Sequence, residues 1–198
     1  PKLKSADMDT NTFIMWLLEL KAWCKLHSIT PFVIGPMSDD ITEAQVAQGK
    51  RYLAAAIEDP ALASAAISGA AGIDIDDDLA EGGAMPAAAA GGSAPAALRW
   101  LNTEYLQGVA EQPAIANLLD SVALKPGQNI ITFKAMFCKL ADALDPAPSD
   151  HVLCTKFTTA ITKKTGQAFE ACITAATAAN STDDFSTFAQ ALCRLCMG

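Results

Sequence analysis

Apolar residues recur along the whole chain with the spacing of amphipathic helices, and no alternation of apolar and polar residues extends beyond four positions. The first predicted helix begins near residue 10, with Asp9 or Thr10 as its N-cap. Its apolar stripe consists of Phe13, Trp16, Leu17, Leu20, Cys24 and His27. The pattern therefore predicts an all-α protein rather than a sheet-containing one.

Start and stop signals divide the first half into further helices. Two prolines and a glycine in residues 29–36 predict an extended apolar connector. Thr42 and Gln45 have the spacing of a capping box, which predicts a helix that stops near Pro60. An alanine-rich helix follows over residues 60–69.

The middle of the chain changes in composition. Residues 70–93 are rich in Gly, Ala and Asp, and we expect a mobile loop there. Ser93 is suited to cap the next helix, with Pro95 in its first turn, where the missing N–H has no cost. Residues 108–113 then interrupt the helical pattern.

The second half predicts about five helices. A spaced apolar stripe consists of Ile130, Phe133, Phe137, Leu140 and Leu144, and Ser181 or Thr182 is the expected cap of the last helix. We therefore expect two small helical lobes joined by a short linker, an N-terminal lobe over residues 1–110 and a C-terminal lobe over residues 111–198.

Composition and charge narrow the function. Hydrophobic residues make up 51% of the 198 residues and charged residues 18%, which is enough apolar surface for a large core. A net charge of −8 argues against binding nucleic acid through bulk electrostatics. We expect no signal peptide and no membrane segment, because charged residues break the longest apolar block. Six cysteines within apolar helical patterns indicate a reducing, intracellular setting.

Residues for chemistry are scarce. His27 and His151 have no partner at motif spacing. Cys193 and Cys196 form a C-x-x-C, but no second ligand pair lies nearby, and the acidic run at residues 74–78 lacks the Gly and Glu of a calcium loop. We expect no catalytic residue, no metal site and no cofactor.

The helix that begins near residue 94 carries Leu98, Leu101 and Tyr105 on one face. This block resembles the W-x-x-L-x-x-x-Y helix of copia-type LTR retrotransposon Gag proteins, with Leu98 where the family has Trp. The order of the surrounding segments also resembles that family, including the aromatic-led first helix and the closing helix over residues 181–195.

A second resemblance lies in the C-terminal half. Gly127, Gln128, Phe133, Phe137 and Lys139 are similar to the major homology region of retroviral capsids, although the usual Glu is missing. The two resemblances together imply a retroviral capsid-like fold with an N-terminal and a C-terminal lobe.

The resemblance implies a structural capsid protein, not an enzyme. Such a protein would self-assemble, through pentameric or hexameric units, into a cytoplasmic virus-like particle that encloses retroelement RNA. Contact with RNA would be made mainly by segments outside this chain, which has no zinc knuckle. The chain would not contact a membrane.

Trp100 is the candidate interface residue. It lies roughly 160–200° around the helix from the Leu98–Tyr105 face, so it either packs within its own lobe or contacts another lobe or subunit. Two other functions stay open. One is an α-helical adaptor that binds other proteins without forming shells, and the other is an enzyme that holds a cofactor in a helical bundle.

Overall fold

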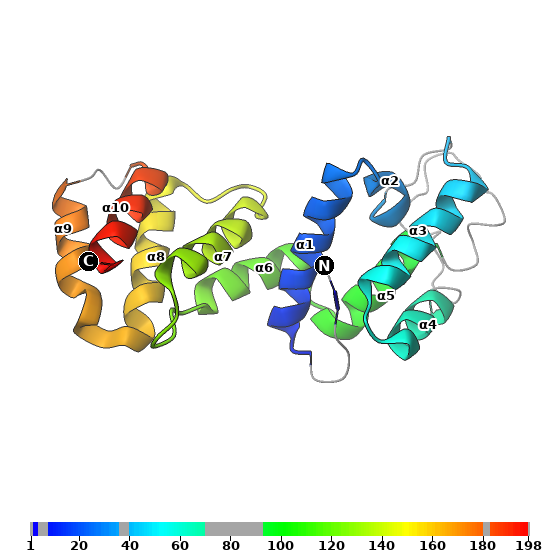
Figure 1. The fold of residues 1–198 in the computed structure, drawn as a ribbon, viewed down its shortest axis with the longest axis horizontal. Coiled ribbons are helices and arrows are strands. Elements are labelled where there is room, and N and C mark those ends of the chain that lie inside the picture. Colours follow the sequence, from blue (N-terminus) through cyan, green and yellow to red (C-terminus); the bar gives the residue numbers. More distant parts are fainter. Residues whose placement is uncertain (1, 4–7, 36–39, 70–92, 180–182, 198) are drawn as a thin grey trace. The chain divides into compact units, whose positions relative to one another are not determined.

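The computed structural model describes residues 2–3, 8–35, 40–69, 93–179 and 183–197. Every regular element within these residues is a helix, and the one extended pairing recorded there is an isolated parallel bridge between Leu3 and Ile57 (Figure 1). The predicted all-α fold is confirmed. The chain divides into two compact units, Pro1–Glu111 and Gln112–Gly198, called unit 1 and unit 2 below.

The first helix of unit 1 is α1 (Thr10–Leu26), whose N-cap is Asp9, one of the two predicted candidates. The Asp9 carboxylate accepts a hydrogen bond from the Thr12 backbone N–H at 2.7 Å. The predicted stripe is buried from Phe13 to Cys24. His27 is different, because it lies at the C-cap of α1 and is exposed.

The connector after α1 was predicted to be extended, and this is wrong at its centre. Residues Thr30–Val33 form a short helix, α2, with Pro31 in its first turn. Proline suits that position because its φ angle is already helical and the N–H it lacks has no intrahelical partner there. The predicted break therefore acts as a helix start.

Helix α3 (Glu43–Ala56) begins with the predicted capping box between Thr42 and Gln45. Gly49 lets α2 and α3 approach closely, because a Cβ atom at this position would lie 2.1 Å from the carbonyl oxygen of Phe32. Helix α4 occupies Pro60–Gly69, as expected. The backbone N–H of Leu3 donates a hydrogen bond to the carbonyl oxygen of Ala56, the last residue of α3, at 2.7 Å.

Helix α5 (Ala94–Leu106) contacts α1, α2, α3 and α4. The Ser93 hydroxyl caps it by accepting from the Ala96 N–H at 3.3 Å, and Pro95 lies in its first turn as predicted. All residues from Ser93 to Leu98 are buried, so the first half of α5 is enclosed on every side. Of the expected mobile loop at 70–93, residues 70–92 lie outside the described part of the chain.

The helices of unit 2 follow the predicted order with corrected boundaries. They are α6 (Glu111–Ser121), α7 (Ile130–Asp142), α8 (Asp150–Thr165), the 3₁₀ turn η3 (Gly166–Phe169), α9 (Glu170–Ala179) and α10 (Phe185–Met197). Pro113 does not interrupt the chain as expected. It lies in the first turn of α6, where a proline N–H is not needed.

The cap of α10 also differs from the prediction. Asp184 is followed directly by the helix, and its carboxylate accepts from the Thr187 backbone N–H at 3.0 Å. The predicted caps, Ser181 and Thr182, lie outside the described residues. Hydrogen bonds from Thr187 to the Asp184 carboxylate lower the pKa of Asp184.

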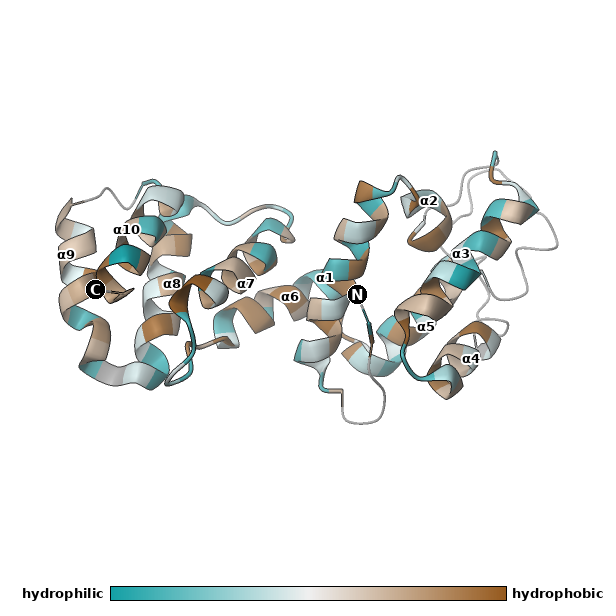
Figure 2. Cartoon of the chain, viewed as in Figure 1, coloured by the Kyte–Doolittle hydropathy of each residue, from teal (hydrophilic) through white to brown (hydrophobic). Residues whose placement is uncertain are grey.

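Each unit has its own core. In Figure 2, brown and teal faces alternate along the helices, as expected for amphipathic helices packed around apolar interiors. The core of unit 2 is a phenylalanine cluster in which Phe137 contacts the rings of Phe133, Phe157 and Phe185, with centroids 5.1–6.4 Å apart. These rings come from α7, α8 and α10, so aromatic packing joins three helices.

Candidate interaction surfaces

The signature residues of α5 pack inside unit 1. Leu98 and Leu101 are buried, and Tyr105 is half-buried. The Tyr105 ring stacks on Phe13 of α1, with centroids 4.9 Å apart. The Thr10 hydroxyl also donates to the Tyr105 carbonyl oxygen at 3.0 Å. This face of α5 therefore holds α1 in place rather than facing a partner.

Trp100 occupies a different environment. It is half-buried, between the exposed Arg99 and the fully buried Leu101. It lies just after the enclosed first half of α5 and before the exposed Thr103 and Glu104. Unit 1 thus covers part of this side chain and leaves part of it accessible.

The segment that resembles the major homology region forms a closed turn and the helix after it. Gly127 has a φ of +77°, a conformation that glycine adopts without strain. The Gln128 side-chain oxygen accepts from the Lys125 N–H at 3.1 Å, and the Gln128 N–H donates to the Lys125 oxygen at 3.0 Å. Asn129 then caps α7 by accepting from the N–H groups of Ile131 and Thr132.

The remaining residues of that segment have separate roles. Phe133 and Phe137 are fully buried in the phenylalanine cluster. Lys139 is exposed in the last turn of α7, where a positive charge interacts favourably with the helix dipole. The segment therefore positions α7 within unit 2, and its turn is closed by Gln128 without the usual Glu.

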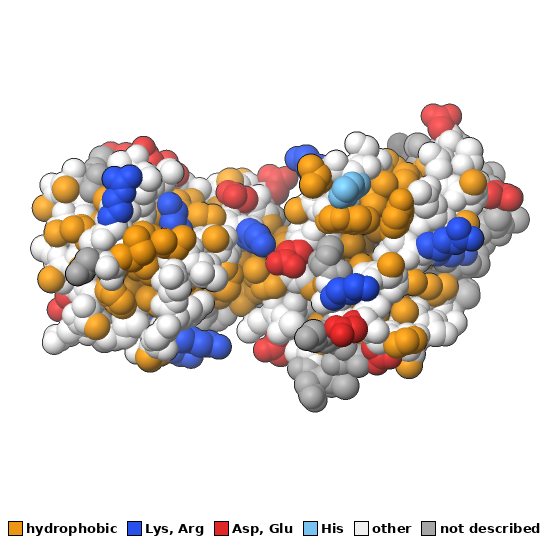
Figure 3. Space-filling view, in the orientation of Figure 1, with side chains coloured by type: hydrophobic (Ala, Val, Ile, Leu, Met, Phe, Trp, Pro, Cys, Tyr) orange, Lys and Arg blue, Asp and Glu red, His pale blue; other side chains and the backbone are white. Residues whose placement is uncertain are grey.

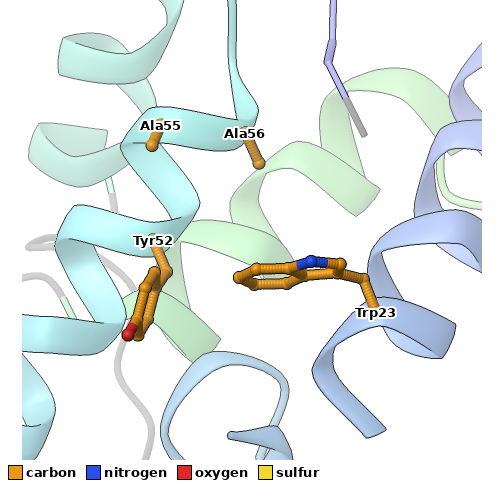
Figure 4. Close-up of a pocket in the computed structure, with 4 residues that line it drawn as sticks. All are labelled: Trp23, Tyr52, Ala55 and Ala56. Atoms are coloured by element: carbon orange, nitrogen blue, oxygen red, sulfur yellow. The ribbon is translucent and has the colours of Figure 1, made fainter. Parts of the chain in front are cut away.

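A small hollow of about 180 Å³ opens between α1 and α3 in unit 1. It is lined by Trp23, Tyr52, Ala55 and Ala56. Figure 4 shows the Trp23 ring reaching across from α1 toward α3, with the Tyr52 ring set edge-on to it. The two ring planes meet at 70°, and their centroids are 5.7 Å apart.

The surroundings of the hollow are mostly apolar. The His27 ring packs on Trp23 at 4.6 Å, and the Gln48 side-chain amide donates to the Tyr52 hydroxyl at 2.8 Å. Hydrophobic side chains gather on this face of unit 1, over α1, α2 and α3 (Figure 3). Such a site can receive an apolar side chain but lacks a paired acid and base for catalysis.

This hollow was not predicted from the sequence. Trp23 follows Trp16 by seven residues, which places both on one side of α1, so the pattern did contain a signal. Trp16 is buried and its indole N–H donates to the Ala56 oxygen at 3.3 Å. The partner residues on α3 follow only from the tertiary packing.

Apolar side chains also remain exposed on both units. In unit 2, Ile131 and Val152 are 49% and 40% exposed, and Leu195 and Met197 are 45% and 55% exposed. In unit 1, Leu26 is 79% exposed and Val109 is 44% exposed. Each of these side chains is available for contact with another molecule.

The residues considered for chemistry are divided between the two units. His27 belongs to unit 1 and His151 to unit 2, and both are exposed. In the C-x-x-C, Cys193 is buried and Cys196 is half-buried. Over the described residues, no group of three or more His, Cys, Asp and Glu side chains has the arrangement of a metal site.

Comparison with known proteins identified no similar protein or family. A scan against protein-family models and searches of curated proteins and of solved structures found no match to this chain. None of the helices within the described ranges combines the length and apolarity required to cross a bilayer.

Proposed function

We propose that this chain is a structural capsid protein of the Gag type, which self-assembles into particles that enclose RNA. The observation that carries the proposal is the division into two helical units, each with its own aromatic core and each with apolar side chains left on its surface. Assembly needs rigid units and repeated contacts rather than catalytic groups. The resemblance of α5 and of the Gly127–Lys139 segment to Gag and capsid sequences points the same way.

The charge distribution supports self-association through unit 2. Residues 112–198 contain seven acidic and seven basic side chains, whereas residues 1–111 contain fifteen acidic and seven basic ones. The whole net charge of −8 therefore lies in unit 1. Copies of unit 2 meet without net charge repulsion, and the exposed Ile131 and Val152 provide apolar contact area.

The proposal includes the contacts and the location expected of such a protein. Ring contacts within pentamers or hexamers would involve unit 1, and Trp100 is the candidate residue because it is only partly covered. RNA would be bound mainly by segments outside this chain, since unit 1 is acidic. The particles would be cytoplasmic.

One observation favours a second candidate, an α-helical adaptor. The hollow between Trp23 and Tyr52 has the size and apolar lining to receive a side chain of a partner protein. An adaptor would use this hollow and would stay small in solution.

Assembly measurements separate the two candidates. Salt screens the repulsion between acidic copies, so light scattering and negative-stain electron microscopy of the full chain should show large particles as protein and salt concentrations rise. A chain that stays monomeric or dimeric throughout that range contradicts the capsid proposal.

Two matched tryptophan variants sharpen the test. Trp100 and Trp23 are both half-buried residues of unit 1. Under the capsid proposal, Trp100→Ala loses particles while Trp23→Ala keeps them, with circular dichroism showing both folded. If Trp23→Ala instead abolishes assembly and Trp100→Ala does not, the assembly contact lies at the hollow and the role given to Trp100 is wrong.

A further inference from the structure

Two half-buried cysteines from different helices lie together in unit 2. Cys172 is near the start of α9, Cys196 is near the end of α10, and these two helices pack against each other. The Cys172 thiol donates a hydrogen bond to the Leu195 carbonyl oxygen, 3.4 Å from its sulfur. Leu195 directly precedes Cys196 in α10, so this hydrogen bond holds the Cys172 sulfur beside the turn of α10 that carries Cys196.

This arrangement differs from the pattern seen in the sequence. The C-x-x-C spacing pairs Cys196 with Cys193, but Cys193 is buried in the core at 5% exposure. The structure instead places the Cys172 thiol against the Leu195 carbonyl, next to Cys196, although Cys172 and Cys196 are far apart in sequence. Because the Cys172 sulfur lies 3.4 Å from the carbonyl oxygen of the residue before Cys196, side-chain rotation can bring the two sulfurs toward disulfide geometry.

We propose that Cys172 and Cys196 form a redox modification site, which closes an intramolecular disulfide between α9 and α10 by exchange with a low-molecular-weight disulfide. Both side chains are partly exposed, so a small reagent can reach them. The bond would join the two helices covalently.

The exchange takes place in two balanced steps. Cys172 loses its proton to solvent and attacks one sulfur of the reagent, whose S–S bond breaks and whose other half leaves as a thiolate. Cys196 then loses its proton and attacks the Cys172 sulfur, which expels the second half of the reagent. The two protein thiols lose two electrons in all, and the reagent disulfide is reduced to two thiols.

The order of these steps follows from the environment of Cys196. Burial and the neighbouring Cys172 sulfur raise the pKa of the Cys196 thiol to about 12, so this sulfur stays protonated at neutral pH. Cys196 therefore acts second, as the resolving thiol. The rate of the second step should rise with pH, because it depends on the Cys196 thiolate.

Peptide mapping of the oxidised full chain tests the proposal. The reduced protein is treated with oxidised glutathione, free thiols are alkylated, and the chain is cut after Lys and Arg and before Asp. These cuts fall between Cys172 and Cys193 and between Cys193 and Cys196, so each sulfur is on its own peptide. We expect a Cys172–Cys196 linked peptide and an intact mass lower by two hydrogens.

Two alanine variants provide the matched comparison. Cys172→Ala should stop at a stable glutathione adduct or not react, while Cys193→Ala should form the disulfide as fast as the parent chain. The proposal is overturned if the parent chain yields a Cys193–Cys196 or Cys138–Cys193 link, only glutathione adducts, or no loss of thiols. The parent-chain map decides even if a variant does not fold.

Discussion

The ring of Tyr105 stacks on the ring of Phe13 at a centroid distance of 4.9 Å and an interplanar angle of 22°. Phe13 is the first buried residue of α1, and Tyr105 is close to the end of α5. Two helices that are widely separated in the chain are thereby joined within unit 1. Tyr105, the last of the three signature residues, therefore stabilises the packing of α5 against α1.

Replacing Tyr105 should destabilise unit 1. Tyr105→Ala removes one ring of the stacked pair and should lower the free energy of unfolding by about 2–3 kcal/mol. Tyr105→Phe keeps the ring and should stay within about 1 kcal/mol of the parent chain. All three tryptophans, Trp16, Trp23 and Trp100, belong to unit 1, so tryptophan fluorescence during urea denaturation reports this unit. Equal losses in the two variants would show that the stacking does not matter.

Gly49 gives a prediction with a definite sign. In an unconstrained helix, Gly→Ala stabilises by about 1 kcal/mol because alanine has the higher helix propensity. Here the added Cβ would meet the Phe32 carbonyl oxygen at 2.1 Å, so α2 must move or the helix must strain. We expect Gly49→Ala to destabilise unit 1 by about 2 kcal/mol or more. A variant as stable as the parent chain in the same fluorescence assay would contradict this close contact between α2 and α3.

The core of unit 2 can be tested separately from unit 1. Phe137 is fully buried and contacts three other phenylalanine rings, so Phe137→Ala should cost about 3–5 kcal/mol. In thermal denaturation followed by circular dichroism, part of the helical signal should be lost at a lower temperature than in the parent chain. The tryptophan fluorescence transition should not move, because unit 2 contains no tryptophan. A shift in that transition would mean that the two units unfold as one.

Cys24 predicts loss of stability at alkaline pH. Burial raises the pKa of this thiol from 9.0 to about 11 in the folded chain. Because the folded state disfavours the thiolate, the stabilisation is complete below about pH 9 and is lost as pH rises from 9 to 11, by up to about 2 kcal/mol. In Cys24→Ala, the free energy of unfolding measured by tryptophan fluorescence should depend less on pH over this range.

In the Cys24→Ala variant, the stability of unit 1 should still fall with pH above about pH 10, because Tyr105 also loses its proton there. Burial, followed by the nearby charges of Asp59 and Glu104, raises the pKa of Tyr105 above 10.0. A Cys24→Ala chain with the full alkaline slope of the parent would contradict the assignment to the thiol.

Local signals in the sequence predicted much of the fold. Caps are short-range interactions, so the Thr42–Gln45 box and Ser93 were identified from spacing alone, and Asp9 was one of two candidates for the cap of α1. Apolar periodicity likewise predicted the buried stripes of α1 and α7, because burial selects one face of a helix.

Contacts between distant segments were not predictable in this way. Pro31 was interpreted as a break although it starts α2, because proline suits both a helix start and an extended connector. The hollow beside Trp23 requires Tyr52 of α3, and the Cys172–Cys196 pair requires α9 to pack against α10. Periodicity tells which face of a helix is apolar, but the partner of that face depends on the tertiary arrangement.

The packing of α4 against α5 has a practical consequence for protein engineering. These two helices, on either side of residues 70–92 in the sequence, pack against each other directly. The entropy of closing a connecting segment grows only with the logarithm of its length, by about 0.6 kcal/mol for each doubling. An epitope or a fluorescent reporter spliced between Gly69 and Ser93 should therefore leave unit 1 folded, which makes this junction the place to label the protein.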